Sequence, residues 1–358
     1  MTQLVNIFLT IAELALIAAT LLPLSRSGAW WIRTLDFPRI QIAILGAAVL
    51  AADLALRTAD GASALWIRAG LALSVLYQLY QIRPYTIFSR KEVQPAKAAR
   101  RESTLSLLLA NVKMDNRNAA RLREIIAAAD PDIVLIVEAD SWWASELDGL
   151  TKTYPFTVRQ PQDNTYGMML YSRLELLGPE IRFLVEDDIP SMRARVKLPA
   201  ATEVEIYCLH PRPPVPQESP RSTERDAELM VVGKETKGKQ LPIIVMGDLN
   251  DVAWARTNYL FQRISGLLDP RIGRGLYNSF HADYFFLRFP LDHFFHSNHF
   301  RLIELKRLAY FGSDHFPMFI RLSYEPEARH QQKPAEADSS DHAEAAETIQ
   351  EAATEPKA

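Results

Sequence analysis

The sequence predicts an α/β domain of mixed β-sheets, with many short strands and few helices, that follows a strongly apolar N-terminal region. Two observations lead to this prediction. From about residue 103 onward, short runs of β-forming residues alternate with amphipathic or polar stretches. Before residue 84, three long apolar windows follow one another, each long enough to span a bilayer. A hydrophobic content of 48% in 358 residues also allows a sizeable core.

The three apolar windows predict transmembrane helices at about residues 4–24, 40–56 and 62–82. At about 1.5 Å of rise per residue, such windows match a hydrocarbon core of about 30 Å. Each window carries a charged residue, namely Glu13, Asp53 and Arg68. Glu13 lies mid-window, and either a contact within the helix bundle or a functional role would explain it. A soluble helical hairpin is the alternative for the whole region.

Basic residues around these windows predict the orientation in the membrane. Arg26, Arg33 and Arg39 lie between the first two windows, and a second basic group follows the third window, between Arg83 and Arg101. The positive-inside rule therefore places the remaining chain in the cytoplasm, behind a membrane anchor that spans residues 1–83. We expect a bacterial inner-membrane protein, with the periplasmic side as the alternative because large domains can be translocated.

Composition defines the segments that flank the α/β region. Residues 84–102 contain two prolines and mixed charge, and we interpret them as a linker. Residues 325–358 are acidic and poor in large apolar side chains, which predicts a disordered tail. Residues 100–324 have 28 basic and 29 acidic side chains, and this near-neutral charge disfavours a protein that coats duplex DNA. Cys208 is the only cysteine, which excludes an intramolecular disulfide and a cysteine-rich zinc site.

Within the α/β region, eight apolar runs are typical of strands. They cover residues 105–112, 132–139, 166–172, 191–198, 204–210, 241–247, 291–297 and 315–322. The spacing of Leu122, Ile125 and Ile126 predicts an amphipathic helix over residues 118–130, and a second helix is expected at about 223–234.

Polar residues stand at or near the ends of several of these runs, where an α/β fold gathers a functional site. They are Asn111, Glu138, His210, Asp248, Asn250, Asp292, Asp314 and His315. Each is weak evidence alone, since Gly-Asp-Leu-Asn at 247–250 is also typical of a turn. Taken together and in this order, they form a pattern.

That pattern resembles the endonuclease/exonuclease/phosphatase superfamily, which has the deoxyribonuclease-I-like fold. Gly-Asp-Leu-Asn at 247–250 and Gly-Ser-Asp-His at 312–315 are its most specific parts, and the resemblance covers about residues 103–323. It implies a four-layered α/β sandwich of two mixed β-sheets flanked by helices, which we place at residues 103–324. It also implies a metal-dependent hydrolase of phosphate esters, with Mg²⁺ as the expected cofactor and Mn²⁺ as the alternative.

The resemblance assigns metal binding to three of the residues. Glu138 is the expected ligand, with Asn111 and Asp314 close to the ion. This assignment fits the chemistry, because Mg²⁺ prefers carboxylate and water oxygens and keeps several waters, so one or two carboxylates suffice.

The other residues would carry the catalytic chemistry. The resemblance makes His315 a general base or a phosphate-polarising imidazole, with Asp292 orienting its ring. Asp248 would orient the attacking water, or contact the metal as in family members with a shifted ion. Asn250 and His210 would donate hydrogen bonds to the phosphate.

Neighbouring polar residues receive other roles. We expect Asp251 to cap the helix that follows. Arg212 either binds a phosphate or shapes a proline-rich loop.

The resulting hypothesis is a membrane-anchored, Mg²⁺-dependent phosphoesterase whose substrate is a phosphodiester or phosphomonoester, with a lipid head group favoured by the anchor. A membrane-tethered nuclease acting on DNA or RNA is the alternative. A non-catalytic interaction module is the least favoured, because the set of polar residues is intact. The superfamily shares a mechanism and differs in substrate, so the fold does not choose between the first two.

Overall fold

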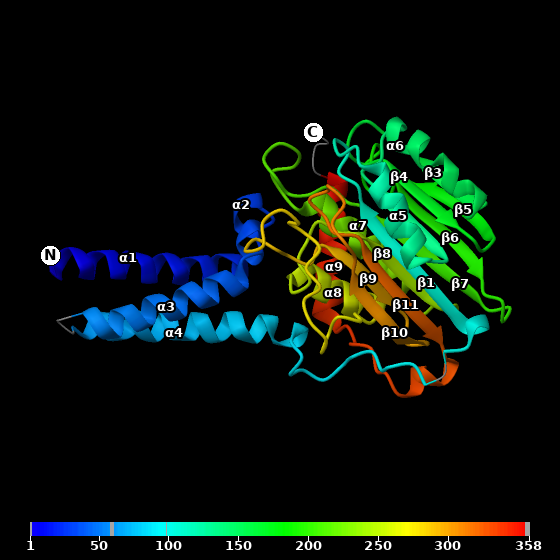
Figure 1. Cartoon of the computed structure of the whole chain (residues 1–358). Coiled ribbons are helices and arrows are strands. Elements are labelled where there is room, and N and C mark those ends of the chain that lie inside the picture. The colour runs from blue at the N-terminus through cyan, green and yellow to red at the C-terminus, as the bar shows by residue number, and fades with distance from the viewer. Residues whose placement is uncertain (1, 58–60, 98, 355–358) are drawn as a thin grey trace. The chain divides into compact units, whose positions relative to one another are not determined.

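A computed structural model describes residues 2–57, 61–97 and 99–354, and the chain folds as two compact units (Figure 1). The first unit contains the chain up to Ser89 together with the loop Pro214–Ser222, and the second contains Arg90–Pro213 and the chain from Thr223 onward. The loop belongs to the first unit because its backbone pairs there: the amide of Trp30 donates to the carbonyl of Pro220 at 3.0 Å.

Three long helices make up most of the first unit: α1 (Thr2–Leu21), α3 (Arg39–Leu56) and α4 (Ala62–Ile82). The short helix α2 (Trp30–Arg33) follows α1. All three long helices are long and apolar enough to cross a membrane, which agrees with the predicted windows. Large apolar side chains such as Phe8 and Trp66 are exposed on these helices. A helix bundle that exposes its apolar surface is typical of a protein whose solvent is lipid.

The buried polar residues of the first unit pair with one another. Arg57 contacts Glu13 at 2.9 Å and also pairs with Asp53, which in turn pairs with Arg68. Both carboxylates are fully buried. Glu13 is therefore part of a contact within the bundle, which is one of the two explanations that the sequence left open.

The second unit contains two mixed β-sheets. The first has the strand order β10-β11-β1-β2-β4-β3 and the second β5-β6-β7-β8-β9. The strands are β1 (Thr104–Asn111), β2 (Ile133–Val137), β3 (Phe156–Gln160), β4 (Met168–Ser172), β5 (Leu176–Arg182), β6 (Ser191–Lys197), β7 (Glu203–Leu209), β8 (Ile243–Asp248), β9 (Asp292–His296), β10 (Phe300–Arg307) and β11 (Met318–Tyr324). The pairs β1–β2 and β7–β8 are parallel, and the other pairs are antiparallel.

Helices cover the outer faces of both sheets, as Figure 1 shows. They are α5 (Ala119–Ala129) and α6 (Ser141–Glu146) on the first sheet, and α7 (Thr223–Thr236), α8 (Arg256–Ser265) and α9 (Ser339–Thr354) on the second. The central core lies between the sheets, where Leu107 and Ile206 belong to the same apolar cluster. The predicted four-layered α/β sandwich is confirmed.

All eight predicted strands are present, whereas β3, β5 and β10 were missed. These three strands lie at sheet edges. Their sequences are Phe-Thr-Val-Arg-Gln, Leu-Leu-Gly-Pro-Glu-Ile-Arg and Phe-Arg-Leu-Ile-Glu-Leu-Lys-Arg. Polar residues and proline are tolerated at an edge, so these segments lack the apolar run that identifies an inner strand.

The predicted linker is packed over part of its length. Val93 is fully buried, Pro95 pairs with Leu302 beside β10, and the Glu92 carboxylate accepts a hydrogen bond from the amide of Asp269 at 2.7 Å. The second unit accordingly begins at Arg90 rather than at the predicted residue 103. Val93 is a single apolar residue among polar ones, so the sequence has no periodic apolar pattern from which this packing could be predicted.

The predicted disordered tail contains a helix, α9, so that prediction is wrong over residues 339–354. Ala345 is fully buried against the cluster that also contains α7 and α8. Arg263 on α8 pairs with Asp338 at 3.0 Å and Asp341 at 2.5 Å, and Arg256 pairs with Glu344. The composition rule counts large apolar residues, and it misses an alanine face that docks against arginines of another helix.

Candidate active site

Asn111 joins the ends of three strands. Its side-chain Nδ2 donates to Glu138 Oε1 at 2.6 Å and to Asp248 Oδ2 at 3.0 Å, while its Oδ1 accepts from the amide of Lys113 at 2.9 Å. Asn111 ends β1, Glu138 directly follows β2, and Asp248 ends β8. Strands β1 and β2 are parallel, so their carboxyl ends meet at one sheet edge, and the second sheet adds β8.

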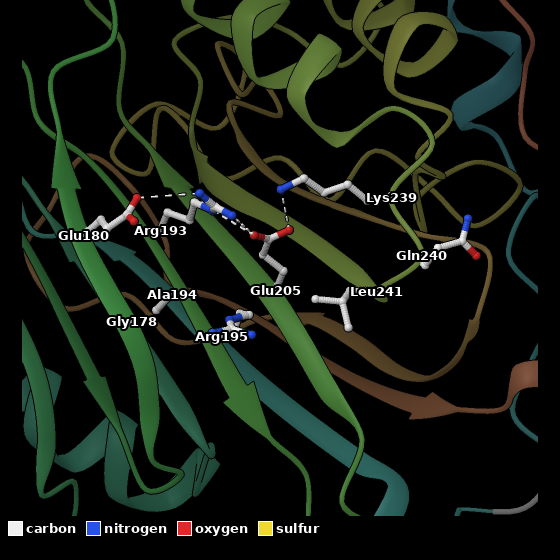
Figure 2. Close-up of a pocket in the computed structure, with 9 residues that line it drawn as sticks. All are labelled: Gly178, Glu180, Arg193, Ala194, Arg195, Glu205, Lys239, Gln240 and Leu241. Atoms are coloured by element: carbon white, nitrogen blue, oxygen red, sulfur yellow. Dashed lines mark hydrogen bonds and ion pairs between the residues drawn. The ribbon is translucent and has the colours of Figure 1, made fainter.

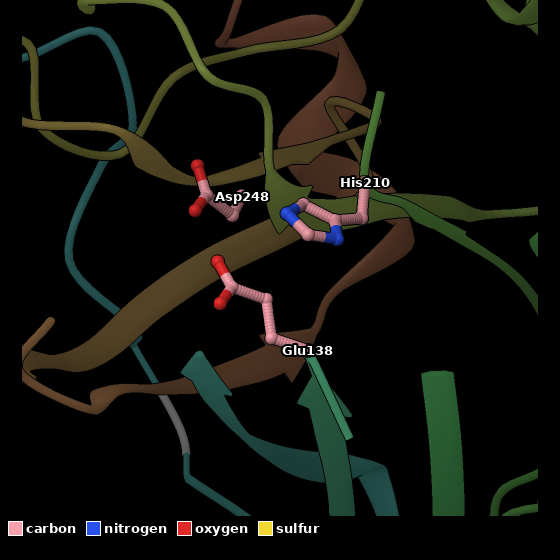
Figure 3. Close-up of side chains that lie close together, drawn as sticks. All are labelled: Glu138, His210 and Asp248. Carbon is pink, nitrogen blue, oxygen red and sulfur yellow. The ribbon is translucent and has the colours of Figure 1, made fainter. Parts of the chain in front are cut away.

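Glu138, His210 and Asp248 converge on one space, as Figure 3 shows. One ligand atom from each residue lies within 4.8 Å of the others. Glu138 has a left-handed backbone, with φ of 60°, which turns the chain away from β2. Burial raises the pKa of Glu138 to about 7; the hydrogen bond from Asn111 and the charge of His315 lower it, and the nearby Asp248 adds to the rise.

His315 connects this group to Asp292. Its Nδ1 donates to Asp292 Oδ2 at 2.7 Å, and its Nε2 lies 3.5 Å from Asp248 Oδ2. Burial opposes the charged imidazolium, but the Asp292 and Asp248 carboxylates outweigh it and raise the pKa of His315 to about 10. Ser313 fixes the backbone here, because its Oγ accepts from the His315 amide at 3.0 Å and donates to the Asn111 carbonyl at 2.8 Å.

His210 is buried and its Nδ1 has no hydrogen-bond partner among the described residues. Burial lowers the pKa of this imidazole to about 4, which leaves the ring neutral near pH 7. The Tyr166 ring lies 5.5 Å away, measured between ring centroids. The other ring nitrogen, Nε2, faces Glu138 and Asp248 in Figure 3 and is available to a bound group there.

The Gly-Asp-Leu-Asn segment at 247–250 contains the last two residues of β8 and the start of the turn that follows it. Gly247 is required there, because a Cβ would lie 1.8 Å from the carbonyl oxygen of Leu209. Asn250 has a left-handed backbone with φ of 51°, and its amide donates to Asp248 Oδ1 at 3.0 Å. Its side-chain Nδ2 donates to the carbonyl of Pro211 at 2.9 Å, beside His210.

Asp251 does not cap the next helix, contrary to the expectation from sequence. The N-cap position of α8 is Ala255, without a side-chain hydrogen bond. Asp251 pairs instead with the buried Arg225 at 3.0 Å, and Arg225 also donates to the carbonyl of Asn250 at 2.8 Å. Sequence reasoning missed Arg225, because nothing in the α7 sequence indicates contact with a loop that follows β8.

Asp314 and Arg212 lie outside the buried group. The Asp314 side chain is partly exposed and lies 3.5 Å from Lys113 Nζ. Arg212 pairs with Glu186 at 2.9 Å, and its guanidinium lies 5.4 Å from the centre of the Tyr166 ring. The ion pair with Glu186 favours the loop-shaping role for Arg212 over phosphate binding.

The residues present fit a divalent cation. Glu138, Asp248 and Asp292 bring carboxylates together in a buried region, where the His315 imidazolium offsets one charge. Asp292 Oδ1 has no hydrogen-bond partner among the described residues. Carboxylate and amide oxygens are ligands that Mg²⁺ and Mn²⁺ accept.

Comparison with known families identifies this arrangement. Residues 108–315 match the profile of the Endonuclease/Exonuclease/phosphatase family. The chain belongs to this family. It is therefore a metal-dependent hydrolase that acts on phosphate ester bonds. No curated protein matches the chain.

Solved structures share the fold of this family member at low sequence identity. D. rerio TDP2 complexed with single-strand DNA product is 17% identical, with a TM-score of 0.53 over 62% of this chain and 99% of that chain. An endonuclease/exonuclease/phosphatase from Beutenbergia cavernae is 18% identical, with a TM-score of 0.51 over 63% of this chain and 72% of that chain. A family protein from Bacteroides thetaiotaomicron is 18% identical, with a TM-score of 0.50 over 66% of this chain and 98% of that chain.

Proposed function

We propose that the chain is a membrane-anchored, Mg²⁺-dependent phosphoesterase that acts on a phosphate ester at the membrane surface, with a lipid head group as its substrate. One observation carries the proposal: a buried carboxylate group and a His–Asp pair belong to the same chain as three helices able to cross a bilayer. These helices would form the anchor, and the positive-inside bias favours a cytoplasmic location for the second unit.

We assign cation binding to Glu138, with Asn111 and Asp314 beside the ion. When bound, Mg²⁺ or Mn²⁺ would neutralise charge on the phosphoryl oxygens and the leaving group. Asn111 holds the Glu138 carboxylate through the 2.6 Å hydrogen bond, which fixes its direction before a cation arrives. The Asp314 side chain is partly exposed and would add a carboxylate near the ion.

We assign the hydrolytic step to residues around Asp248. Asp248 orients the attacking water and accepts its proton as the new P–O bond forms and the bond from phosphorus to the ester oxygen breaks. The leaving alcohol gains its proton from solvent. His315, held through Nδ1 by Asp292, presents Nε2 to the same space and stabilises negative charge on a phosphoryl oxygen. His210 and Asn250 donate to the remaining phosphoryl oxygens, from Nε2 and Nδ2 respectively; Asn250 would exchange its bond to Pro211 for the phosphate.

A membrane-tethered nuclease is the second candidate, because one solved structure of similar fold, D. rerio TDP2, is a complex with a single-strand DNA product. The full chain in detergent micelles with Mg²⁺ would be given mixed phospholipid vesicles, plasmid DNA and RNA in separate reactions. We expect phosphate-ester hydrolysis with vesicles, and no activity after chelation. DNA or RNA cleavage at physiological salt without lipid hydrolysis would support the nuclease instead.

A further inference from the structure

A loop beside His315 exposes four consecutive apolar side chains. This aromatic loop is Tyr284–Leu287, and it contains Phe285 at 79% and Phe286 at 57% exposure. In a soluble protein, consecutive exposed apolar residues mark a contact surface rather than chance exposure.

Backbone hydrogen bonds connect the two ends of the aromatic loop. The amide of His281 donates to the carbonyl of Leu287 at 3.1 Å, and the amide of Leu287 donates to the carbonyl of Tyr284 at 3.1 Å. At its base, the Phe280 amide donates to the Phe289 carbonyl at 3.0 Å. The apolar tip is therefore held outward by hydrogen bonds of its own backbone.

The base of the aromatic loop is attached to the catalytic segment. The amide of Phe316 donates to the carbonyl of Ser279 at 2.8 Å, and the Ala282 amide donates to the Asp314 carbonyl at 2.6 Å. The Phe280 ring lies 5.0 Å from the His315 ring, between centroids. Whatever binds the tip will therefore lie close to the reacting groups.

Two arginines flank the same base. The guanidinium groups of Arg288 and Arg307 lie 5.0 Å and 4.4 Å from the centre of the Phe316 ring. Neither has a carboxylate partner in the part of the chain that the structure describes, and Arg288 Nε is buried without any hydrogen bond. Burial and the neighbouring Arg288 lower the pKa of Arg307. An anion at this position would relieve the repulsion between them.

A second cationic surface differs from the arginine pair because its cations have acidic partners. A hollow of about 380 Å³ on β5, β6 and β7 is lined by Arg193, Arg195 and Lys239 (Figure 2). There the cations already have acidic partners: Lys239 lies 2.7 Å from Glu205, and Arg195 pairs with a glutamate of β7 at 2.8 Å. That hollow needs no further anion, whereas the arginine pair beside the aromatic loop does.

We propose that the aromatic loop and the pair Arg288 and Arg307 form a bilayer-contact surface that seats the active site on phospholipid head groups. Aromatic side chains favour the membrane–water interface, and arginine binds phosphate through planar paired donors. The chain's own apolar helices make a bilayer the available partner. This inference rests on the proposed function and adds the element that recognises the lipid surface.

A single-cysteine label tests the contact directly. Cys208 is buried, so Phe285→Cys introduces the one accessible thiol in the described chain. The full chain, labelled with a polarity-sensitive fluorophore, would be reconstituted into vesicles that contain a shallow lipid nitroxide. We expect blue-shifted emission and quenching at position 285, and neither at the matched control Glu124→Cys on α5. Equal signals at both positions, no quenching at 285, or a response only to added single-stranded DNA would overturn the proposal.

Activity separates this inference from the proposed function. The variant Phe285→Ser/Phe286→Ser removes two rings whose burial in the bilayer interface would stabilise the contact. We expect the ratio of vesicle to soluble phosphodiester turnover to fall by about tenfold or more, with Tyr259→Ser as the exposed aromatic control. An unchanged ratio would overturn the inference. Turnover of neither substrate by the unaltered chain would instead contradict the proposed function, while the label would still test the contact.

Discussion

The two units handle buried charge in different ways. In the first unit, Glu13 and Asp53 pair with Arg57 and Arg68, so that two carboxylates meet two guanidinium groups. In the active site, Glu138, Asp248 and Asp292 share a buried region with one imidazolium, that of His315. A buried charge must be neutralised by its surroundings. We call Glu13, Asp53, Arg57 and Arg68 the balanced cluster, because its charges cancel within the protein. Glu138, Asp248, Asp292 and His315 form the unbalanced cluster, whose excess negative charge suits it to bind a cation.

A buried acid on α7, Glu228, shows a third way in which a buried carboxyl group is accommodated: it is protonated. Glu228 is buried, and one of its carboxylate oxygens has no hydrogen-bond partner among the described residues. Burial raises its pKa to about 8, with the nearby Glu186 adding to the rise. The Glu228 side chain is therefore neutral at pH values below about 8. The structural acids are thus either paired with arginines or protonated. The acids assigned to the active site are instead clustered around one imidazolium.

Removing the imidazolium from the unbalanced cluster should have the largest effect. We expect His315→Ala to lower kcat by about 10²–10³-fold, the usual cost of removing one donor that stabilises developing negative charge. The exposed His330→Ala is the matched control and should keep full activity. Steady-state turnover, with circular dichroism to verify folding, measures this. Full activity in His315→Ala would remove His315 from the mechanism.

Breaking the balanced cluster should affect stability. Asp53→Asn leaves two guanidinium groups without their shared carboxylate, and loss of one partner of a buried pair costs about 3–5 kcal/mol. Unfolding of the full chain in detergent by increasing denaturant measures the loss. The double variant Asp53→Asn/Arg68→Gln should recover part of it, because the charge is balanced again. A double variant that loses the sum of both single effects would contradict charge balance as the cause.

The raised pKa of Glu228 predicts that the stability of the folded protein depends on pH. The folded pKa of Glu228, about 8, is above its ordinary value of 4.5, so the folded state retains a proton that the unfolded state releases between these values. Stability from this group is present in full below pH 4.5 and falls as pH rises towards 8, by at most about 1.4 kcal/mol per pH unit. Glu228→Gln should flatten the dependence of the unfolding temperature on pH, and the exposed Glu124→Gln should not. The same slope in both variants would refute the assignment.

The smallest effect is expected at the C-terminal helix. The pair formed by Arg256 and Glu344 is partly exposed, and pairs of this kind contribute about 0.2–1 kcal/mol. Arg256→Ala should therefore speed amide hydrogen exchange in α9 without unfolding α8. Unchanged exchange would show that the apolar contact of Ala345 and the ion pairs of Arg263 hold the helix without this pair.

The sequence predicts what depends on local pattern. Inner strands are apolar runs, and the end residues Asn111, Glu138 and Asp248 follow from where those runs stop, so both sheets and the candidate residues were accessible. The edge strands β3, β5 and β10 and the helix α9 were not, because they lack an apolar run and depend on partners distant in sequence, such as Arg263 for Asp338. Arg225 was missed for the same reason: its task is to hold a loop on another element.

The central claim is that Glu138, in the cluster of unbalanced carboxylates, binds a divalent cation used in hydrolysis. Electron paramagnetic resonance of Mn²⁺ added to the full chain measures this binding directly, with Glu138→Gln and the exposed Glu124→Gln as a matched pair. We predict bound Mn²⁺ in the unaltered chain and in Glu124→Gln, and an affinity at least about tenfold weaker in Glu138→Gln. Equal affinity in all three proteins, with phosphoesterase activity that survives chelation, would contradict the claim.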